Sequence, residues 1–282
     1  MNARARIAVS TLLSLAGIAR AQFTESFDAV SQFSPGSPQG MTLPGWTFQN
    51  SANPTGTTGM YNGIDTLGMP FVFPQQGGTG FLAANFNNTT NANTISTWAI
   101  SPMTLLKNGG ILRFWTRTVD APVTYPDRIQ VRLSVSGVST NVGPLLTPTA
   151  VGDFTTLLLD INPAYTMSDF PSVWTEYTIT LSGLPASGVN GRFALRYFVE
   201  NGGPSGINSD YTGFDTLSYT LPAPPPPCYA NCDGVGSLTG NDFQCFLNAY
   251  VAGQSYANCD GVGGLTGNDF QCFLDKYVAG CS

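Results

Sequence analysis

Residues 128–137 read RIQVRLSVSG, and apolar and polar side chains alternate through this stretch. A period of two is the pattern of a β-strand that is buried on one face. Five further stretches rich in Val, Ile, Thr, Phe and Tyr share the region: LRFWTRTV from Leu112, TTLLLDI from Thr155, EYTITLSGL from Glu176, GRFALRYFV from Gly191 and GFDTLSYTL from Gly213. Clusters of Gly, Pro, Asn and Ser separate them. The pattern predicts a mainly β protein, an antiparallel two-sheet sandwich of the jelly-roll kind.

The composition restricts the function. Only 10% of the residues are charged, the net charge is -6, and basic patches are absent, which disfavours binding to nucleic acid. The chain contains no His, so the usual general base, the His-containing zinc sites and the Ser-His-Asp arrangement are all excluded. We therefore predict a protein that is not an enzyme.

The amino terminus has the features of a signal peptide over residues 1–21. Two arginines precede an apolar run at residues 7–19, and Ala19-Arg20-Ala21 has the form of a cleavage site. The run is too short to span a bilayer, and no later segment is long enough, so we expect no transmembrane segment. These features predict a secreted protein, extracellular or associated with the cell surface.

Several phrases between residues 22 and 220 resemble a known family when their order and spacing are taken together. They are FTESFDAV, LPGW, STWAISPMTLL, LRFWTRT, GRFALRY and GFDTLSY. In this order they resemble the choice-of-anchor J family, which is close to the cleaved-adhesin domains and shares a jelly roll with MAM and galactose-binding-like modules. The resemblance implies an adhesin-like domain with a glycan or glycoprotein ligand, followed by a carboxy-terminal attachment device.

A Pro-rich spacer at residues 221–227 is followed by a duplicated segment. The copies are NCDGVGSLTGNDFQCFLNAYVAG from Asn231 and NCDGVGGLTGNDFQCFLDKYVAG from Asn258. Each copy has a Gly-rich polar loop that ends in Asp and then a helical pattern. In the first copy the pattern puts five residues on one face: Phe243, Phe246, Leu247, Tyr250 and Val251. Residues 228–282 are therefore predicted to form a small helical domain of two loop–helix repeats.

Two such repeats resemble a type I dockerin, and the ending Gly280-Cys281 resembles the Cys-containing form called GC-type. The resemblance implies calcium, with eight ligand residues in the two loops: Asn231, Asp233, Thr239, Asp242, Asn258, Asp260, Thr266 and Asp269. The sixth loop positions are Gly236 and Gly263, which permit the sharp turn. The fifth positions depart from the family, because Val235 and Val262 offer no oxygen. We expect weakened calcium binding; a calcium-free loop held by disulfides is the alternative.

The dockerin resemblance also implies a cohesin-domain partner. The positions that face cohesin in this family are Gly240 and Asn241 in the first repeat and Gly267 and Asn268 in the second. They are identical, so a cohesin could dock on either of two equivalent faces. The alternative is that the duplication serves only to bury the two helical faces against each other.

All six cysteines lie in the repeat region, so the body of the protein depends on its core alone. Cys228 and Cys281 have no counterpart in the other repeat, and we pair them with each other. For the remaining four, pairing within a repeat, Cys232 with Cys245 and Cys259 with Cys272, is favoured over pairing between repeats. Zinc binding suits an oxidising compartment poorly.

The first domain shows no recognisable catalytic or ligand-binding constellation. Its acidic residues are expected at turns and on solvated faces: Glu25, Glu176, Glu200, Asp28, Asp120, Asp127, Asp160, Asp210 and Asp215. Jelly rolls of this broad kind often hold a cation between the first and last strands, and Glu25 and Asp215 would be its carboxylates; the alternative is that both are exposed or capped by nearby Ser and Thr. Trp46, Trp98 and Trp115 are expected in the core, and no position is assigned to Trp174. The Gly-rich stretches from Gln75 and Asn201 are interpreted as loops.

Three functions remain open after these observations. The first is a non-catalytic adhesin-like or carbohydrate-binding protein tethered by a dockerin. The second is an extracellular polysaccharide hydrolase carried by a dockerin. The third is a purely structural surface protein.

Overall fold

The structure is a computed structural model, and it describes residues 21–31, 42–64, 72–120, 122–222 and 228–281. Contacts within the chain divide it into two compact units, and the first of them ends at Pro222. The predicted signal peptide lies outside the described residues except for Ala21, with which the first strand begins. No helix in the described ranges is long and apolar enough to cross a membrane.

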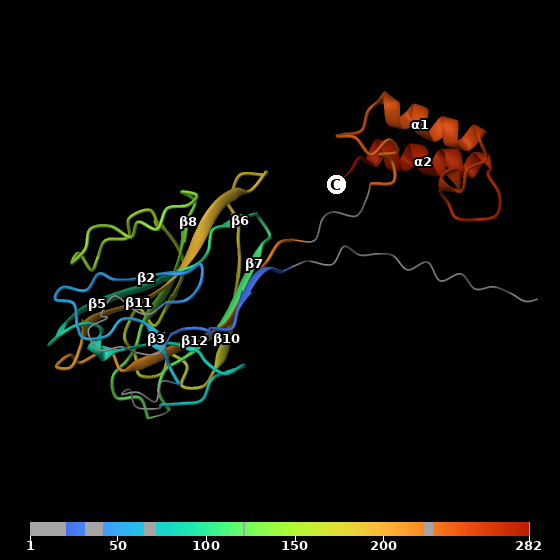
Figure 1. The fold of residues 1–282 in the computed structure, drawn as a ribbon. Helices are drawn as coiled ribbons and strands as arrows, with labels where there is room; N and C mark the ends of the chain where they lie inside the picture. Colours follow the sequence, from blue (N-terminus) through green and yellow to red (C-terminus); the bar gives the residue numbers. More distant parts are fainter. Residues whose placement is uncertain (1–20, 32–41, 65–71, 121, 223–227, 282) are drawn as a thin grey trace, which may run out of the picture. The chain divides into compact units, whose positions relative to one another are not determined.

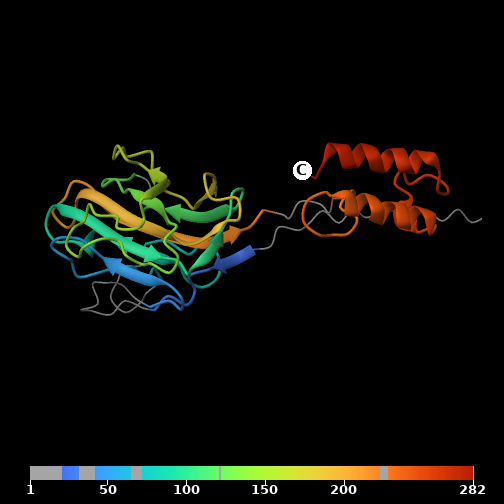
Figure 2. The same ribbon diagram turned by 90° about the horizontal axis from the view of Figure 1, so that it is seen from above.

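The first unit is a sandwich of two six-stranded sheets, and every strand pairing among its described residues is antiparallel (Figures 1 and 2). The predicted fold class is thus confirmed. The first sheet has the order β10-β7-β12-β4-β3 with β1 also on β12, and the second has the order β2-β5-β11-β8-β9 with β6 also on β11. The strands are β1 (Ala21–Glu25), β2 (Thr47–Asn50), β3 (Tyr61–Asn62), β4 (Leu82–Asn85), β5 (Asn93–Ile100), β6 (Thr104–Leu106), β7 (Ile111–Arg117), β8 (Ile129–Ser134), β9 (Thr156–Ile161), β10 (Thr175–Thr180), β11 (Val189–Gly202) and β12 (Tyr211–Thr220).

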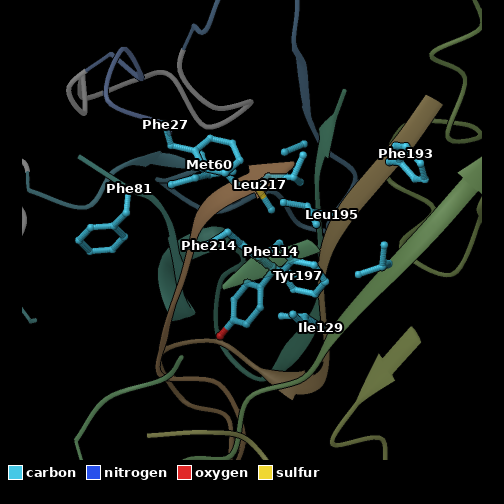
Figure 3. Packing of buried hydrophobic residues seen from close by; sticks show 14 of the residues in the cluster. Phe27, Met60, Phe81, Phe114, Ile129, Phe193, Leu195, Tyr197, Phe214 and Leu217 are labelled. Atoms are coloured by element: carbon cyan, nitrogen blue, oxygen red, sulfur yellow. The ribbon is translucent and has the colours of Figure 1, made fainter. Parts of the chain in front are cut away.

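The main core lies between the two sheets. In β8 the alternating stretch puts Ile129, Val131 and Leu133 into this core. Figure 3 shows aromatic side chains from both sheets filling the same layer, among them Phe114 and Tyr197. Since burial of such side chains is the main favourable term in folding, this layer alone accounts for a first unit without disulfides.

A second, smaller core lies on the other face of the second sheet. Trp98 from β5 packs against Phe154, with ring centroids 5.9 Å apart, and Ile100, Val142 and Ala194 complete the cluster. The guanidinium of Arg196 is buried beside them, 4.4 Å from the Trp98 ring. The segment between β8 and β9 therefore covers this part of the sheet.

The second unit, called the repeat module below (residues 228–281), contains helices α1 (Gly240–Val251) and α2 (Gly267–Ala279) and the 3₁₀ turn η2 (Ser255–Ala257). Phe246 and Phe273, which are equivalent in the two repeats, stack at 3.9 Å in its centre. The prediction for Val251 was wrong: it is 86% exposed, and Ala249 is buried in its place. The equivalent Val278 in α2 is 85% exposed, so this position of the repeat faces solvent in both helices.

Candidate functional site

Each loop of the repeat module opens with an asparagine whose amide oxygen has no partner. The Asn231 amide Nδ2 donates to the carbonyl of Gly236 at 3.1 Å, and Asn258 donates to Gly263 at 3.0 Å. The two Oδ1 atoms are buried, and no described residue donates a hydrogen bond to them. A buried acceptor without a donor costs free energy. Each loop therefore holds an oxygen that suits an added cation.

The loops end at Asp242 and Asp269, both fully buried. Each carboxylate accepts the N–H of the threonine that caps the next helix, Thr239 in one repeat and Thr266 in the other, at 2.8 Å. These backbone donors hold the pKa of both aspartates below its ordinary value. Both groups are thus ionised at neutral pH, and this capping box stabilises the helix start with or without a metal.

The other loop positions are matched between the repeats. Asp233 accepts the N–H of Val235 at 2.9 Å, and Asp260 accepts that of Val262 at 2.8 Å. The valine side chains are 70% and 71% exposed, so they project into solvent and contribute nothing to the loop interior. Each loop thus has two carboxylates and one unpartnered amide oxygen.

Backbone geometry and hydroxyl groups complete the two loops. Gly236 and Gly263 adopt φ values of 66° and 67°, a region that glycine enters without strain. The Thr239 and Thr266 hydroxyls, predicted as calcium ligands, accept the N–H groups of Asn241 and Asn268. These hydroxyls therefore already serve as helix caps.

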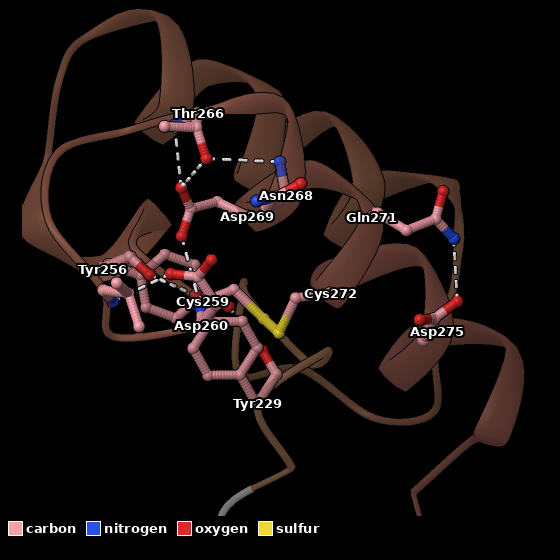
Figure 4. Close-up of a disulfide and its surroundings, with 11 residues drawn as sticks. Tyr229, Tyr256, Cys259, Asp260, Thr266, Asn268, Asp269, Gln271, Cys272 and Asp275 are labelled. Carbon is pink, nitrogen blue, oxygen red and sulfur yellow. Dashed lines mark hydrogen bonds between the residues drawn. A yellow bond between two sulfur atoms is a disulfide. The ribbon is translucent and has the colours of Figure 1, made fainter.

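The six cysteines form three disulfides: Cys228–Cys281, Cys232–Cys245 and Cys259–Cys272. These are the pairings that the sequence favoured. Figure 4 shows the bridge of the second repeat near two tyrosines. Tyr229 and Tyr256 stack with ring centroids 4.9 Å apart, and each hydroxyl donates to the backbone carbonyl of the other tyrosine. The pair is related by the duplication, so the module has an internal pseudo-two-fold axis.

The four residues predicted to face cohesin all lie at the starts of the helices. Gly240 and Asn241 begin α1, Gly267 and Asn268 begin α2, and all four are exposed. The two pairs therefore present equivalent surfaces to solvent.

The structure gives no support to a cation between Glu25 and Asp215. Glu25 accepts hydrogen bonds from the Phe27 N–H and the Trp46 indole. Asp215 lies at a bulge of β12 and accepts the N–H groups of Gln76, Gly77 and Thr216. Protein donors thus already occupy all four carboxylate oxygens. The described residues contain no cluster of three or more His, Cys, Asp and Glu side chains of the kind that binds a metal ion, and each loop of the repeat module has two carboxylates.

A cavity of about 180 Å³ opens among the loops of the sandwich, and we call it the loop pocket. Its lining comes from three places in the chain: the 3₁₀ turn η1 (Phe86–Asn88), the β7–β8 loop and the β11–β12 turn. The lining residues are Phe86, Tyr125, Gly203, Pro204, Gly206, Ser209 and Asp210. Backbone bonds fix the walls, because Phe86 donates to Asp210 at 2.9 Å and Ser209 donates to Pro126 at 3.0 Å. The pocket is therefore preformed.

Asp210 is the acidic group of the loop pocket. Burial, and then the nearby Asp127 carboxylate, raise its pKa to about 6. No described residue donates a hydrogen bond to its side chain. Asp127 is fully buried behind it and accepts the Tyr197 hydroxyl, the Thr118 hydroxyl and the Asp210 N–H, the last at 2.9 Å. The pocket thus combines two aromatic side chains with one available acceptor.

The other carboxylates of the sandwich are spread over its surface. Asp120 pairs with Arg117, Asp160 and Glu200 pair with Arg128, and Asp28 accepts the N–H groups of Thr79 and Gly80. Glu176 is exposed in β10. Asp127 and Asp215 depart from the expectation of surface residues, because both are fully buried.

The tryptophans divide differently from the prediction. Trp46 and Trp98 are buried, as expected. Trp115 was predicted in the core but is half-buried, since it alternates with the inward Phe114 in β7. Trp174 is also half-buried and packs on Phe73 and Phe81.

No protein-family model matches the chain, and no curated protein matches it. Among solved structures, the K3 cleaved adhesin domain of Lys-gingipain from Porphyromonas gingivalis W83 is similar over 72% of this chain and 100% of its own, with 16% identity and a TM-score of 0.47. The K1 domain of the same protein matches over 71% and 98%, with 18% identity and a TM-score of 0.45. The CBM22-1 xylan-binding domain of Paenibacillus barcinonensis Xyn10C matches over 73% and 97%, with 11% identity and a TM-score of 0.36. Similarity at this level does not carry a function from those proteins to this chain.

Proposed function

We propose that this chain is a secreted, non-catalytic, adhesin-like protein whose sandwich binds a glycan or glycoprotein. Its repeat module acts as a calcium-binding dockerin and tethers it to a cohesin-domain partner at the cell surface or in an extracellular complex. One observation carries the proposal: both repeats hold a buried, unpartnered asparagine oxygen at the same loop position. Three disulfides in the same module suit an oxidising compartment.

Calcium fits the residues of the two loops. Hard cations take carboxylate and amide oxygens, and each loop offers both kinds, from Asn231, Asp233 and Asp242 in the first repeat. A calcium ion would be the missing partner of the buried asparagine oxygen. Because Val235 and Val262 contribute no oxygen, the calcium affinity is reduced. We expect a dissociation constant of roughly 10⁻⁴–10⁻³ M, as in other extracellular calcium-binding modules.

Calorimetric titration of the full chain with calcium chloride tests this part. The wild type should bind two ions, and the double variant Asn231→Leu/Asn258→Leu should bind none. Asn248→Leu, an exposed residue of α1 outside the loops, is the matched control. Equal calcium binding by the wild type and the double variant would contradict the assignment. Chelation should leave the helical circular dichroism signal in place, whereas reduction of the disulfides should remove it.

The proposed cohesin docking uses the pairs Gly240-Asn241 and Gly267-Asn268, which are exposed and equivalent in the two repeats. If either face can dock, Asn241→Arg or Asn268→Arg alone leaves the affinity for a type I cohesin domain nearly unchanged, and the double variant loses it. Loss in either single variant would mean that only one face docks, leaving the duplication as a packing device.

The loop pocket is the proposed glycan site. Aromatic side chains stack on the apolar faces of sugar rings, and an unpaired carboxylate accepts their hydroxyl groups. Tyr125 is 48% exposed and Asp210 has no donor among the described residues, so both are available. The cavity is smaller than the roughly 300–1,000 Å³ of drug-sized sites, which favours one terminal sugar over a long chain.

A glycan array with the full chain, run beside a hydrolysis screen on the same polysaccharides, tests the site. Binding should weaken at least tenfold in Tyr125→Ala and Asp210→Asn. The matched controls are Val138→Ala and Asp169→Asn, both exposed residues outside the pocket. Equal binding by pocket and control variants would place the glycan elsewhere, and no binding at all would leave the purely structural function.

The hydrolase alternative keeps one supporting observation, the raised pKa of Asp210. Glycoside hydrolysis uses two carboxyl groups that flank the bond. The nearest partner, Asp127, is fully buried, and its two oxygens accept hydrogen bonds from the protein. It therefore does not reach a substrate in the pocket. Sugar release in the screen that Asp210→Asn abolishes would restore the hydrolase.

A further inference from the structure

The two repeats differ at two adjacent helix positions near the stacked tyrosines, Asn248-Ala249 in α1 and Asp275-Lys276 in α2. Lys276 in α2 corresponds to Ala249 in α1, and the offset between them is the same as between Asn258 and Asn231. The Lys276 ammonium lies 4.4 Å from the centre of the Tyr229 ring. The outer face of Tyr229 is thus covered by a cation from the chain itself.

The equivalent face of Tyr256 is not covered in this way. A cavity of about 570 Å³, the tyrosine hollow, is lined there by Cys232, Cys245, Asn248, Ala249, Ala252, Gln254 and Tyr256. The duplication relates this side of Tyr256 to the side of Tyr229 that Lys276 covers, because Ala249, the equivalent of Lys276, lines the hollow together with Tyr256. The short side chain of Ala249 leaves the space that the lysine occupies in the other repeat.

We propose that the tyrosine hollow binds a lysine or arginine side chain of a partner protein, placed over the Tyr256 ring as Lys276 is placed over Tyr229. An aromatic face attracts a cation through the ring quadrupole. Asn248 corresponds to Asp275, which precedes Lys276 in the second repeat. Its side-chain oxygen accepts a hydrogen bond from the Gln244 amide at 2.9 Å and has a second lone pair for the incoming group.

The charge of the module favours the same occupant. Residues 228–282 contain five aspartates, Asp233, Asp242, Asp260, Asp269 and Asp275, against a single basic residue, Lys276. In the calcium-free module this charge attracts a cationic side chain and repels an acidic one. Two bound calcium ions would cancel it, so the geometry of the hollow carries the inference. The inference concerns the chemistry of the contact and does not depend on whether the partner is a cohesin.

Nuclear magnetic resonance of the full chain with labelled tyrosine tests the proposal. The probes are Nα-acetyl-arginine amide and its neutral counterpart Nα-acetyl-norleucine amide. The arginine probe should shift the Tyr256 ring signals and bind about twofold to thirtyfold more tightly than the neutral probe, the range expected for a cation over an aromatic ring. Equal binding of the two probes would mean that the hollow takes apolar groups, and the proposal would be wrong.

Two exchanges between the repeats give the variant test. Ala249→Lys should fill the hollow with the chain's own cation and abolish the Tyr256 shifts. Lys276→Ala, at an exposed position, should open a second site and add equivalent shifts at Tyr229. The second exchange keeps the test valid if Ala249→Lys fails to fold. Absence of new shifts at Tyr229 in a folded Lys276→Ala chain would overturn the proposal.

Discussion

Removing the bridge between Cys228 and Cys281 should destabilise the repeat module more than removing either bridge within a repeat. The first closes a chain separation of 53 residues, and each of the others closes 13. In the chain-entropy account, loops of these lengths correspond to about 4 and about 3 kcal/mol of stabilisation. When the two within-repeat bridges are intact, they shorten the loop that the terminal bridge closes. The expected stabilisation by the terminal bridge then falls from about 4 to about 3.5 kcal/mol, which is still more than about 3 kcal/mol.

The full chain allows this measurement without cutting out the module. The α-helices of the described residues lie only in the module, whereas all four tryptophans lie in the sandwich. Urea unfolding followed by far-ultraviolet circular dichroism at helical wavelengths therefore reports the module, and tryptophan fluorescence reports the sandwich. Cys228→Ala/Cys281→Ala is compared with Cys232→Ala/Cys245→Ala and Cys259→Ala/Cys272→Ala. Fluorescence unfolding should be unchanged in all three.

Two results would refute the reasoning. If the terminal pair costs less than a within-repeat pair, loop length does not control the stability of the module. If the two within-repeat pairs differ by more than about 1 kcal/mol, the repeats are not energetically equivalent despite their equal loop lengths.

Three further predictions concern the two candidate sites and the core of the module. Because Asp210 has a pKa raised from 3.8 to about 6, its proton stabilises the folded state at low pH, and that contribution is lost as pH rises through about 6. Relative to Asp210→Asn, the wild-type sandwich should lose about 1 to 2 kcal/mol between pH 4 and 7 in urea titrations, a value reduced for partial exposure of the carboxyl. Phe246→Ala and Phe273→Ala should each lower the free energy of unfolding of the module by about 3 to 5 kcal/mol. They should reduce the helical signal to the same extent, because either substitution removes the same stacked pair. Val235→Asp/Val262→Asp should tighten calcium binding at least tenfold by calorimetry, because each loop gains a carboxylate at the position where the family supplies one.

The repeat module was largely predictable because its chemistry is local. The spacing of Asn231, Asp233 and Asp242 fixes the loop, and a threonine followed three residues later by an aspartate predicts a helix start. The sequence did not predict two features of the module. Val251 fits the apolar face of α1, but it faces solvent, as does the equivalent Val278 in α2. The tyrosine pair lies just before each loop, and its stacking depends on how the two halves meet.

The sandwich was predictable in class but not in its sites. The pattern of β-forming residues identifies the six strands from β7 to β12, but strands β1 to β6 were not predicted. The loop pocket joins Phe86, Tyr125 and Asp210, which are far apart in the sequence and meet only through the order of the strands. Arg196 is another case: alternation puts it on the solvated face of β11, but the segment containing Phe154 covers that face and buries it. Such layers depend on long loops, whose positions no local pattern reveals.

The duplication also explains the role of the terminal disulfide. Cys228 precedes the first repeat as Ser255 precedes the second, and Cys281 follows the second repeat as Gln254 follows the first. The bridge between Cys228 and Cys281, with Cα atoms 5.3 Å apart, thus occupies the place that the Gln254–Ser255 peptide bond occupies half a turn away. The two repeats are therefore joined at two equivalent points, once by a peptide bond and once by a disulfide. Within this closed module the central pairs, Phe246 with Phe273 and Tyr229 with Tyr256, are formed by equivalent residues, so a change in one copy alters a contact of both. A sequence difference between the repeats therefore costs least stability at positions outside these pairs. Ala249 and Lys276, which lie beside the tyrosines, are such a position.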